Sequence, residues 1–310
     1  MADQFDLVVI GGGPGGYASA FYAASCGMSV ALVERDTIGG TCLNRGCIPA
    51  KAFLETAAAN RHVAHASEFG INATSLGIDF SVSQARKARI VDGLVKGLTG
   101  LTKSKKVTYL LGTGSLEANR VVNVQLADGT ATKIQANNVI LASGSVPRTI
   151  KGFPIGGSIM TSDEVLMLNT IPKRIAVIGG GAIGCEFAST FADLGSQVTI
   201  LEGAPKILPG LDPDVANVVV KSFTKKKINI KTGIVVTGQS SLPDGSTQIS
   251  FATGDPLIVD VVIMSIGRRA FSDALGLSGT EVKVDDRGFV AVNEYCQTGE
   301  PGVYAIGDLI

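Results

Sequence analysis

The apolar and polar positions of the chain follow one order of elements twice. The first copy has an apolar run at 6–10, a glycine-rich turn, a helical pattern ending near residue 24 and an apolar run at 29–33. The second copy has apolar runs at 174–178 and 197–201, with a helical pattern between them that ends near residue 194. Short apolar strands that alternate with helices are typical of parallel sheets, so the sequence predicts an α/β fold built from two similar units.

A glycine-rich turn follows the first strand of each copy, and an acid ends the second strand about twenty residues later. The first glycine permits the tight turn, the second lets the backbone approach a pyrophosphate, and the third lets the helix pack on the strand. The order strand, turn and helix predicts two Rossmann-like, dinucleotide-binding domains, and the alternative is a pair of glycine turns without a ligand. These residues are Gly11, Gly13, Gly16 and Glu34 in the first copy and Gly179, Gly181, Gly184 and Glu202 in the second.

The acid of the second copy predicts which nucleotide binds there. A carboxylate at this position accepts hydrogen bonds from a ribose 2′-hydroxyl, and its charge repels a 2′-phosphate. Glu202 therefore favours NAD over NADP, and the nearby Lys206 weakens that preference slightly.

The segments outside the two copies predict a β-rich insertion and a return to the first domain. An amphipathic helix is expected from about residue 83 to 101, followed by short β segments with turn signals. The second unit ends around Gly267, after an apolar strand at 259–266. The chain then returns with a predicted strand at 289–293 and a second short strand, which ends at a turn that contains Asp308. Aspartate is also a common turn residue, so Asp308 alone does not indicate a site.

Cys42 and Cys47 are separated by four residues, between a glycine-rich turn and a predicted helix. Pro49 is well placed as the first helical residue, which puts Cys47 at a helix N-terminus. Unpaired N–H groups and the helix dipole favour a thiolate there, so the spacing suggests a reactive thiol pair.

Three other interpretations of this pair remain open: a structural disulfide, part of a metal site, or two buried thiols. Five cysteines with irregular spacing do not resemble the disulfide framework of a small secreted domain. His62 and His65 could add two metal ligands, but their spacing is shorter than zinc sites usually have. We expect both histidines on the surface of an Ala-rich helical stretch that ends near Phe69, and we expect no metal site.

Composition limits the class of protein further. A chain of 310 residues with 45% apolar content can bury roughly two domain cores. Basic and acidic residues balance at 27 each, which argues against nucleic acid or anionic lipid as a partner. The uncharged run 17–33 changes from helix to strand and is a poor membrane span. The first apolar run passes straight into glycines, so we expect no secretory signal and a cytoplasmic location, or a mitochondrial matrix location for a processed eukaryotic chain.

Four motifs resemble those of the pyridine nucleotide-disulfide oxidoreductases. The match spans essentially all 310 residues, and within the family it is nearest to the members that oxidise dihydrolipoyl groups. Ala50, Ser143 and Ala270 stand where serine, threonine and proline are usual in the family. The motifs are GGTCLNRGCIPAK at 39–51 for the redox centre, VILASGSVPR at 139–148 for the ATG motif, SIGRRA at 265–270 for the GRRP run and TGEPGVYAIGD at 298–308 for the second flavin motif.

The resemblance implies a role for each candidate residue. Residues 1–148 and 271–310 would bind FAD, and residues 149–270 would bind NAD. Cys47 would be the thiolate facing the flavin, and Cys42 the thiol that exchanges with a dithiol substrate. Lys51, near the reactive edge of the flavin, would form a buried pair with Glu186. The implied FAD residues are Gly11, Gly13, Gly16, Glu34, Thr41, Lys51, Gly114, Ser143, Gly144 and Asp308, and the implied NAD residues are Gly179, Gly181, Gly184, Glu202 and Gly267.

The implied reaction oxidises a dihydrolipoyl group on an E2 or carrier protein, with electrons passing through the Cys42/Cys47 disulfide and FAD to NAD⁺. Family members are expected to be homodimers whose C-terminal interface domain supplies a His-Glu base. We expect this chain, which ends at Ile310, to lack that domain and to be impaired alone. The alternatives are a truncated, non-catalytic FAD- and NAD-binding module, or a relative of the glutathione or mercuric reductase kind.

Overall fold

A computed structural model describes residues 4–310, which form two compact units. The predicted junctions near residues 148 and 270 lie within three residues of the boundaries between these units. The first unit contains residues 4–47, 91–146 and 268–310, and the second contains residues 48–90 and 147–267.

Residues 48–90 pack with the second unit, although the sequence placed them in the first domain. They include most of helix α3 (Cys47–Ala64) and the start of helix α4 (Phe80–Ser104). Phe53 and Phe80 are buried in the apolar core of the second unit, with ring centroids 5.2 Å apart. The amphipathic patterns of both helices were visible in the sequence, but such a pattern does not say which sheet a helix covers.

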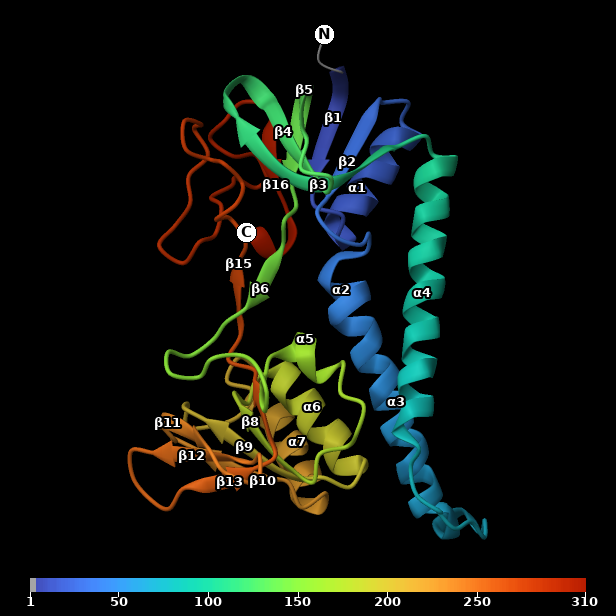
Figure 1. Ribbon diagram of the computed structural model, residues 1–310, viewed down its shortest axis with the longest axis vertical. Helices are drawn as coiled ribbons and strands as arrows, with labels where there is room; N and C mark the ends of the chain where they lie inside the picture. The colour runs from blue at the N-terminus through green and yellow to red at the C-terminus, as the bar shows by residue number, and fades with distance from the viewer. Residues whose placement is uncertain (1–3) are drawn as a thin grey trace. The chain divides into compact units, whose positions relative to one another are not determined.

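A parallel sheet carries the first copy of the repeat (Figure 1). Its central strand β1 (Gln4–Ile10) pairs with β2 (Val30–Glu34) on one side and β5 (Ala131–Leu141) on the other. Helix α1 (Pro14–Ser25) connects β1 to β2 and lies against both, as predicted. The sheet is extended by β3 (Thr108–Glu117) beside β2 and by β16 (Val303–Ala305) beside β5.

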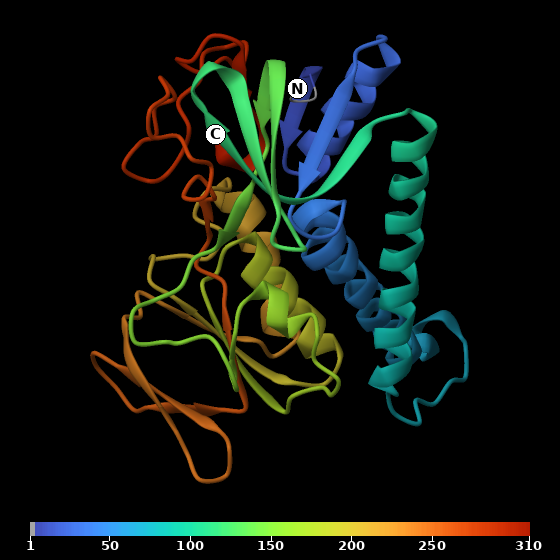
Figure 2. The ribbon, with the colours of Figure 1, turned by 45° about the horizontal axis from the view of Figure 1, so that its top comes forward.

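The predicted β-rich insertion is an extension of this same sheet. Strands β3 and β5 are longer than the parallel sheet needs, and β4 (Val121–Leu126) pairs antiparallel with the projecting part of each. Figure 2 shows these three strands in green beside the blue strands β1 and β2. A short helix η2 (Ala118–Arg120) connects β3 to β4.

Apolar side chains cover both faces of the first sheet, because successive residues of a strand point to opposite faces. Leu7 and Val9 of β1 pack in a cluster with Phe21 of helix α1. Val8 and Ile10 belong to a second cluster, whose other members come from strands β2 to β5 and from the returning segment 270–309. The strand is therefore hydrophobic on both sides, as expected for a central parallel strand.

The second unit repeats the arrangement with five parallel strands in the order β10-β9-β8-β14-β7. Three further strands form a small antiparallel sheet, β11-β12-β13. The parallel strands are β7 (Ile159–Met160), β8 (Arg174–Ile178), β9 (Gln197–Glu202), β10 (Asn229–Thr232) and β14 (Val261–Met264). The remaining elements are η1 (Ala66–Phe69), α5 (Ser162–Val165), α6 (Ala182–Asp193), α7 (Pro213–Lys225), β11 (Val236–Ser241), β12 (Thr247–Phe251) and β13 (Leu257–Val259).

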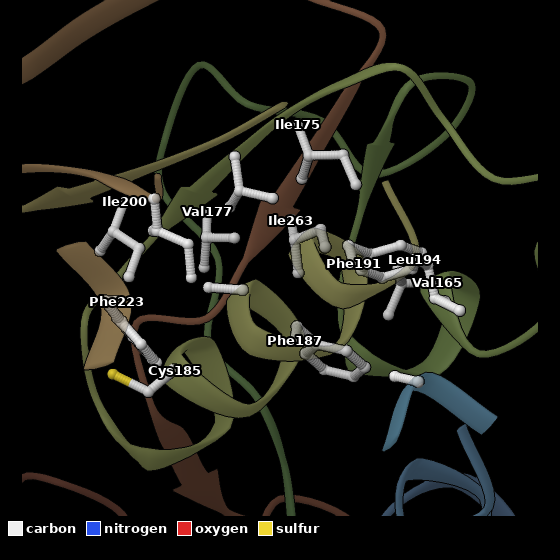
Figure 3. Close-up of a cluster of buried hydrophobic side chains, with 14 of the residues drawn as sticks. Val165, Ile175, Val177, Cys185, Phe187, Phe191, Leu194, Ile200, Phe223 and Ile263 are labelled. Atoms are coloured by element: carbon white, nitrogen blue, oxygen red, sulfur yellow. The ribbon is translucent and has the colours of Figure 1, made fainter. Parts of the chain in front are cut away.

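The parallel sheet of the second unit is the middle layer of three. Ile175 and Val177 of β8 face the helical layer, where they cluster with Phe187 and Phe191 of α6 (Figure 3). The alternate residues of β8 belong to the cluster that contains Ile249 and the other inward residues of the small sheet. This layering confirms the predicted α/β class with β-rich insertions. Within residues 4–310, no helix combines the length and the apolar character needed to cross a bilayer.

The predicted strand at 289–293 is wrong. Only Val290 makes a β-bridge there, with Val284. The carboxylate of Asp285 accepts hydrogen bonds from the backbone amides of Arg287 and Phe289, each at 2.9 Å. These hydrogen bonds hold the segment as a turn. The Asp side chain competes with a neighbouring strand for the backbone amides, and the alternation of apolar and polar residues does not reveal this. The predicted final strand is present as β16 and leads to helix η3 (Gly307–Leu309), which contains Asp308.

We expect Phe191→Ala to lower the free energy of unfolding by about 3–5 kcal/mol, because the change opens a cavity in a packed core. The ring of Phe191 is 1% exposed in the cluster of Figure 3. The matched control is Phe69→Ala in η1, where the same side chain is 74% exposed and its loss should change little. Urea unfolding of both variants measures the difference, and equal losses would contradict this assignment of the core.

Asp260→Asn should lower stability at neutral pH and flatten its decline in acid. Asp260 accepts hydrogen bonds from the Arg174 backbone amide at 2.8 Å, Nε at 3.1 Å and Nη2 at 2.6 Å, which hold the pKa of its carboxyl below the usual range. Because the folded-state pKa is lowered, this stabilisation is present above the unfolded value of about 3.9 and is lost as the pH falls through the folded value.

The measurement is urea unfolding at a series of pH values between about 7 and 2. Asp255→Asn, at an exposed position of the same unit, is the matched control. An identical pH slope for the wild-type chain and Asp260→Asn would contradict the prediction.

Candidate functional site

The first glycine turn brings three backbone segments together without room for side chains. A Cβ on Gly16 would lie 1.7 Å from the carbonyl oxygen of Gly11, and a Cβ on Gly11 would lie 2.2 Å from that of Ala142. Gly11 also has φ +111°, a conformation that favours glycine. Strand β1 and helix α1 are therefore joined by a turn that only glycine can make.

The second turn reproduces this geometry. A Cβ on Gly184 would lie 2.0 Å from the carbonyl oxygen of Gly179, which has φ +106°. The middle glycines are different, because a Cβ on Gly13 would meet its nearest described atom at 3.8 Å and one on Gly181 would meet none within 4 Å. Packing of the described chain does not require glycine at these two positions, which are the N-caps of α1 and α6. Their bare backbone suits the approach of a phosphate to the helix N-terminus.

The two acids are held by the turns themselves. Glu34 Oε2 accepts a hydrogen bond from the Gly12 amide at 2.7 Å, and Glu202 Oε2 accepts one from the Gly180 amide at 2.6 Å. The second carboxylate oxygen of each acid accepts from the amide two residues further on, at 2.9 Å and 2.7 Å. Burial raises the pKa of Glu34, and the bond from Gly12 opposes this effect.

The sequence analysis assigned no role to the amides of Gly12 and Gly180. The spacing of 22 residues between amide and acid, identical in both copies, is the signal that could have identified them. These bonds fix each carboxylate at the end of its strand while leaving lone pairs for ribose hydroxyls.

The redox segment is seated on the first turn. The Gly39 amide donates to the Gly12 carbonyl at 2.8 Å, and a Cβ on Gly40 would lie 2.5 Å from the Gly13 Cα. Helix α2 (Gly40–Arg45) begins at this contact and carries Cys42. The sequence predicted only a turn here, because a helix of six residues is too short to show a period.

The chain folds back between the two cysteines. A Cβ on Gly46 would lie 3.0 Å from the carbonyl oxygen of Thr41, so the residue before Cys47 touches the residue before Cys42. Cys47 is the first residue of α3, which confirms its predicted place at a helix N-terminus, although Pro49 is third in the helix rather than first. Cys47 is exposed and Cys42 is half-buried, so the interpretation as two buried thiols is wrong.

The other three cysteines lie in unrelated environments. Cys185 is buried in the first turn of α6, where burial raises the pKa of its thiol to about 11. Cys26 is exposed at the end of α1, and Cys296 is half-buried in the loop before β16. Of the five, Cys42 and Cys47 alone lie on the segment that packs on the first turn.

Lys51 and Glu186 form the predicted pair within the second unit, with Nζ 2.5 Å from Oε1. The expectation of a buried pair is wrong, because the side chains are 56% and 40% exposed. Lys51 lies in the second turn of α3 and Glu186 in the second turn of α6, and their long side chains meet at the surface rather than in the core. An exposed pair of this kind contributes at most about 1 kcal/mol to stability, so it does not hold the unit together.

The predicted flavin turn is tied to the returning segment of the first unit. Ser143 Oγ donates to the Phe271 carbonyl at 2.7 Å, and the Phe271 amide donates to the Gly144 carbonyl at 2.9 Å. Ser145 Oγ donates to Asp308 Oδ2 at 2.7 Å. Residues far apart in sequence therefore meet here.

One residue at this cluster was missed by the sequence analysis. Arg268 donates from Nε to Ser145 Oγ and from Nη2 to the Ser145 carbonyl, both at 2.7 Å. Arg268 lies in the SIGRRA run, so this motif could have identified it. Only Gly267 of that run was predicted to belong to a site.

The remaining predicted positions have packing explanations of their own. A Cβ on Gly114 in β3 would meet Ile10 and Val33 side chains at 3.1 Å, so close packing of the sheet accounts for this glycine. Gly267 has φ +107°, and its carbonyl accepts from the Arg148 amide at 3.0 Å. Thr41 is exposed at the start of α2.

The histidines are surface residues, as expected. His62 lies in α3, fifteen residues or about four turns beyond Cys47, and His65 Nδ1 is 2.9 Å from Glu68 Oε1 just after the helix. Within residues 4–310, no group of three or more His, Cys, Asp or Glu side chains is arranged to hold a metal ion.

The glycine turns, the fixed acids and the cysteines of α2 and α3 are typical of a thiol protein that binds nucleotides, and comparison with known proteins agrees. The model of the pyridine nucleotide-disulphide oxidoreductase family matches residues 5–310, and the chain belongs to this family. Members of the family use FAD together with NAD or NADP.

Curated relatives carry a more specific name. Over the full length of this chain, it is 42% identical to the dihydrolipoyl dehydrogenase of Chlamydia pneumoniae. Over 99% of this chain, it is 37% identical to the dihydrolipoyl dehydrogenase of Bacillus subtilis. It spans 66% of each of these relatives. Among solved structures, the flavoprotein disulfide reductase RclA of Escherichia coli superposes with a TM-score of 0.89 at 26% identity, covering 99% of this chain and 66% of RclA. LpdA of Mycobacterium tuberculosis shares the fold, with a TM-score of 0.92 at 24% identity over 99% of this chain and 68% of LpdA.

The two glycines of the second turn should respond differently to alanine. Gly184→Ala puts a methyl group against the Gly179 carbonyl, so we expect a loss of stability of about 1–3 kcal/mol or more without any nucleotide. Gly181→Ala has open space and φ −74°, but Gly181 is the N-cap of α6, where alanine is less favourable than glycine, so we expect a smaller loss of about 0.5–1 kcal/mol.

Gly181→Ala should instead weaken NADH binding about tenfold or more, because the methyl group keeps the pyrophosphate from the backbone. Urea unfolding and NADH titration of both variants make the comparison. Equal destabilisation by the two changes, or unaltered NADH binding by Gly181→Ala, would contradict the separate roles of these glycines.

Proposed function

We propose that the protein is a flavin-dependent disulfide oxidoreductase that oxidises protein-bound dihydrolipoamide to lipoamide, with NAD⁺ as the final electron acceptor. The observation that carries this proposal is the seating of the cysteine-bearing helix α2 on the first glycine turn. This contact supports a thiol pair beside the proposed nucleotide site. The names of the curated relatives support the choice of substrate.

We propose that the first unit holds FAD and the second NAD. The first turn fits the FAD diphosphate, because the N-terminus of α1 and the bare backbone of Gly13 can approach it. Glu34 would accept from the adenosine ribose, and Asp308 from the ribityl chain. Thr41, Gly114, Ser143 and Gly144 complete the set that the family resemblance assigns to FAD.

In the second unit, we propose that Gly179, Gly181, Gly184 and Gly267 line the NAD site. Glu202 selects between the nicotinamide nucleotides. Its carboxylate can accept from an unmodified 2′-hydroxyl and repels a 2′-phosphate, which favours NAD over NADP.

The thiol chemistry is assigned to the cysteine pair. A substrate thiolate attacks Cys42 of the Cys42–Cys47 disulfide, forming a mixed disulfide and releasing Cys47 as a thiolate. The second substrate thiol, as a thiolate, then attacks the substrate sulfur of the mixed disulfide. The bond to Cys42 breaks, Cys42 leaves as a thiolate that takes up the proton, and the product is the cyclic lipoyl disulfide, so two electrons now reside on the cysteine pair. The N-terminus of α3 stabilises the Cys47 thiolate through its free amides and dipole.

Bound FAD would supply the two-electron chemistry that links the thiols to the nicotinamide. Lys51, one helical turn beyond Cys47 on α3, would present its ammonium group near the flavin, and Glu186 would orient it. We assign proton acceptance from the substrate to neither His62 nor His65, since both are exposed and well beyond Cys47 on the chain.

The proposal extends to partners and location. A lipoyl-bearing E2 or carrier protein would deliver the dithiol, and a homodimer is expected by family resemblance. A cytoplasmic location is proposed from the sequence alone.

A second candidate is a flavin disulfide reductase that works on another substrate, and the similarity to RclA favours it. The two candidates differ in the direction of electron flow and in the dithiol they accept. Glu202 argues against the family members that use NADPH.

Anaerobic addition of excess dihydrolipoamide, which supplies more than two electrons per flavin, should bleach the visible absorbance of flavin in the FAD-loaded chain. Cys42→Ser and Cys47→Ser should each slow this reduction by more than about a hundredfold, because each removes one sulfur of the disulfide. Cys26→Ser, at an exposed position of the same unit, is the matched control and should behave like the wild-type chain.

NADH should still reduce the flavin in all of these variants. Full-speed reduction by dihydrolipoamide in Cys42→Ser would contradict the thiol assignment. Faster reduction of the flavin by NADPH than by NADH would contradict the NAD assignment.

A further inference from the structure

Arg268 occupies a position that the proposed reaction does not use. It begins strand β15 (Arg268–Ala270), which pairs with β6 (Ser145–Pro147), and its side chain is only 20% exposed. An arginine buried to this extent must find acceptors for its N–H groups. The acceptors here belong to the proposed flavin site rather than to an isolated surface pair.

The guanidinium group donates two hydrogen bonds to Ser145. Nε donates to the side-chain oxygen and Nη2 to the backbone carbonyl, both at 2.7 Å. This use of two donors in a fixed plane is specific to arginine, since the ammonium of lysine cannot reproduce the fork.

The Ser145 hydroxyl in turn donates a hydrogen bond that orients Asp308. Because the serine oxygen accepts from Arg268, its own proton is directed to Asp308 Oδ2, which lies 2.7 Å away. The direct distance from Arg268 Nε to Asp308 Oδ2 is 3.9 Å, too long for a hydrogen bond. Arginine therefore acts on the acid through the serine, with additional attraction between the charges.

Asp308 is held at one oxygen and remains open at the other side. Its side chain is 68% exposed although Oδ2 is fixed. A carboxylate that is anchored in this way loses little freedom when a ligand hydroxyl binds it, which strengthens binding. Arg268 Nη2 also lies 3.5 Å from Thr41 Oγ1, beside Cys42. The guanidinium thus contacts or neighbours residues of three segments assigned to the flavin.

We propose that Arg268 is a positioning residue of the flavin site, which orients Asp308 through the Ser145 hydroxyl so that the free carboxylate oxygen meets the sugar-alcohol chain of FAD. This inference rests on the proposed function, because it requires FAD to bind the first unit. It adds Arg268 and the Ser145 hydroxyl to the site, with no role for either in the transfer of electrons.

The neighbouring residue provides a matched control. Arg269 follows Arg268 in β15 but pairs with Asp273 at 2.7 Å on the surface. Arg269→Met removes the same charge and the same number of atoms as Arg268→Met. A general effect of charge on the first unit would appear in both variants, and a positioning role would appear in Arg268→Met alone.

The experiment measures FAD binding to the 310-residue chain by quenching of flavin fluorescence, with far-UV circular dichroism and urea unfolding as checks of folding. Arg268→Met and Ser145→Ala should each raise the Kd for FAD about tenfold or more, and Arg269→Met should change it less than about twofold. Arg268→Lys should recover only part of the loss. The double variant Arg268→Met/Ser145→Ala should be no weaker than the worse single variant, because both changes break one chain of bonds.

Each of the following results would decide whether Arg268 has this positioning role. FAD binding by Arg268→Met that equals that of Arg269→Met, or additive losses in the double variant, would overturn the positioning role while leaving the proposed function intact. If Arg268→Met does not fold, an unchanged Kd in Ser145→Ala would overturn it equally. Failure of the unaltered chain to bind FAD would overturn the proposed function and this inference together.

Discussion

The first unit depends on a contact between two backbones that leaves no room for a side chain. A Cβ on Gly40 would lie 2.5 Å from the Gly13 Cα, and beside this contact the Gly39 amide donates to the Gly12 carbonyl at 2.8 Å. Through this contact the segment carrying Cys42 begins on the turn that is proposed to bind a dinucleotide. A larger residue at Gly40 would push this segment away from the turn, and the chemistry proposed here requires the thiols and the nucleotide to be neighbours.

The duplicated turn shows how one local structure can serve two purposes. In the second unit the position beside the turn is filled by an apolar segment, with the Leu208 amide donating to the Gly180 carbonyl at 2.8 Å and Ile207 packed against that glycine. Both turns hold their acid with the same pair of amides. They differ in what lies next to them: a cysteine-bearing helix in the first unit and aliphatic side chains in the second. This difference agrees with the proposed roles, in which the thiol chemistry takes place beside the first turn and the second turn binds a nucleotide alone.

The sequence predicted the parts of the fold that depend on local chemistry. Strand periods, glycine spacing and the acids at strand ends all follow from short-range rules, and the structure has these elements within a few residues of their predicted places. Long-range packing was less accessible. The pattern of α3 did not show that Phe53 lies in the second unit, and no spacing rule connects Arg268 with Ser145 and Asp308. The exposure of Lys51 also depends on where two helices meet, which a linear pattern does not contain.

The central claim is that the Cys47 sulfur lies against a flavin bound at the first turn. The most direct test is the absorbance spectrum of the FAD-loaded chain after addition of two electrons per flavin without oxygen. The account predicts a new band at wavelengths beyond the main flavin absorption, arising from a thiolate in contact with the oxidised ring, and its loss in Cys47→Ser. A chain that binds FAD and takes up two electrons without such a band would contradict the account.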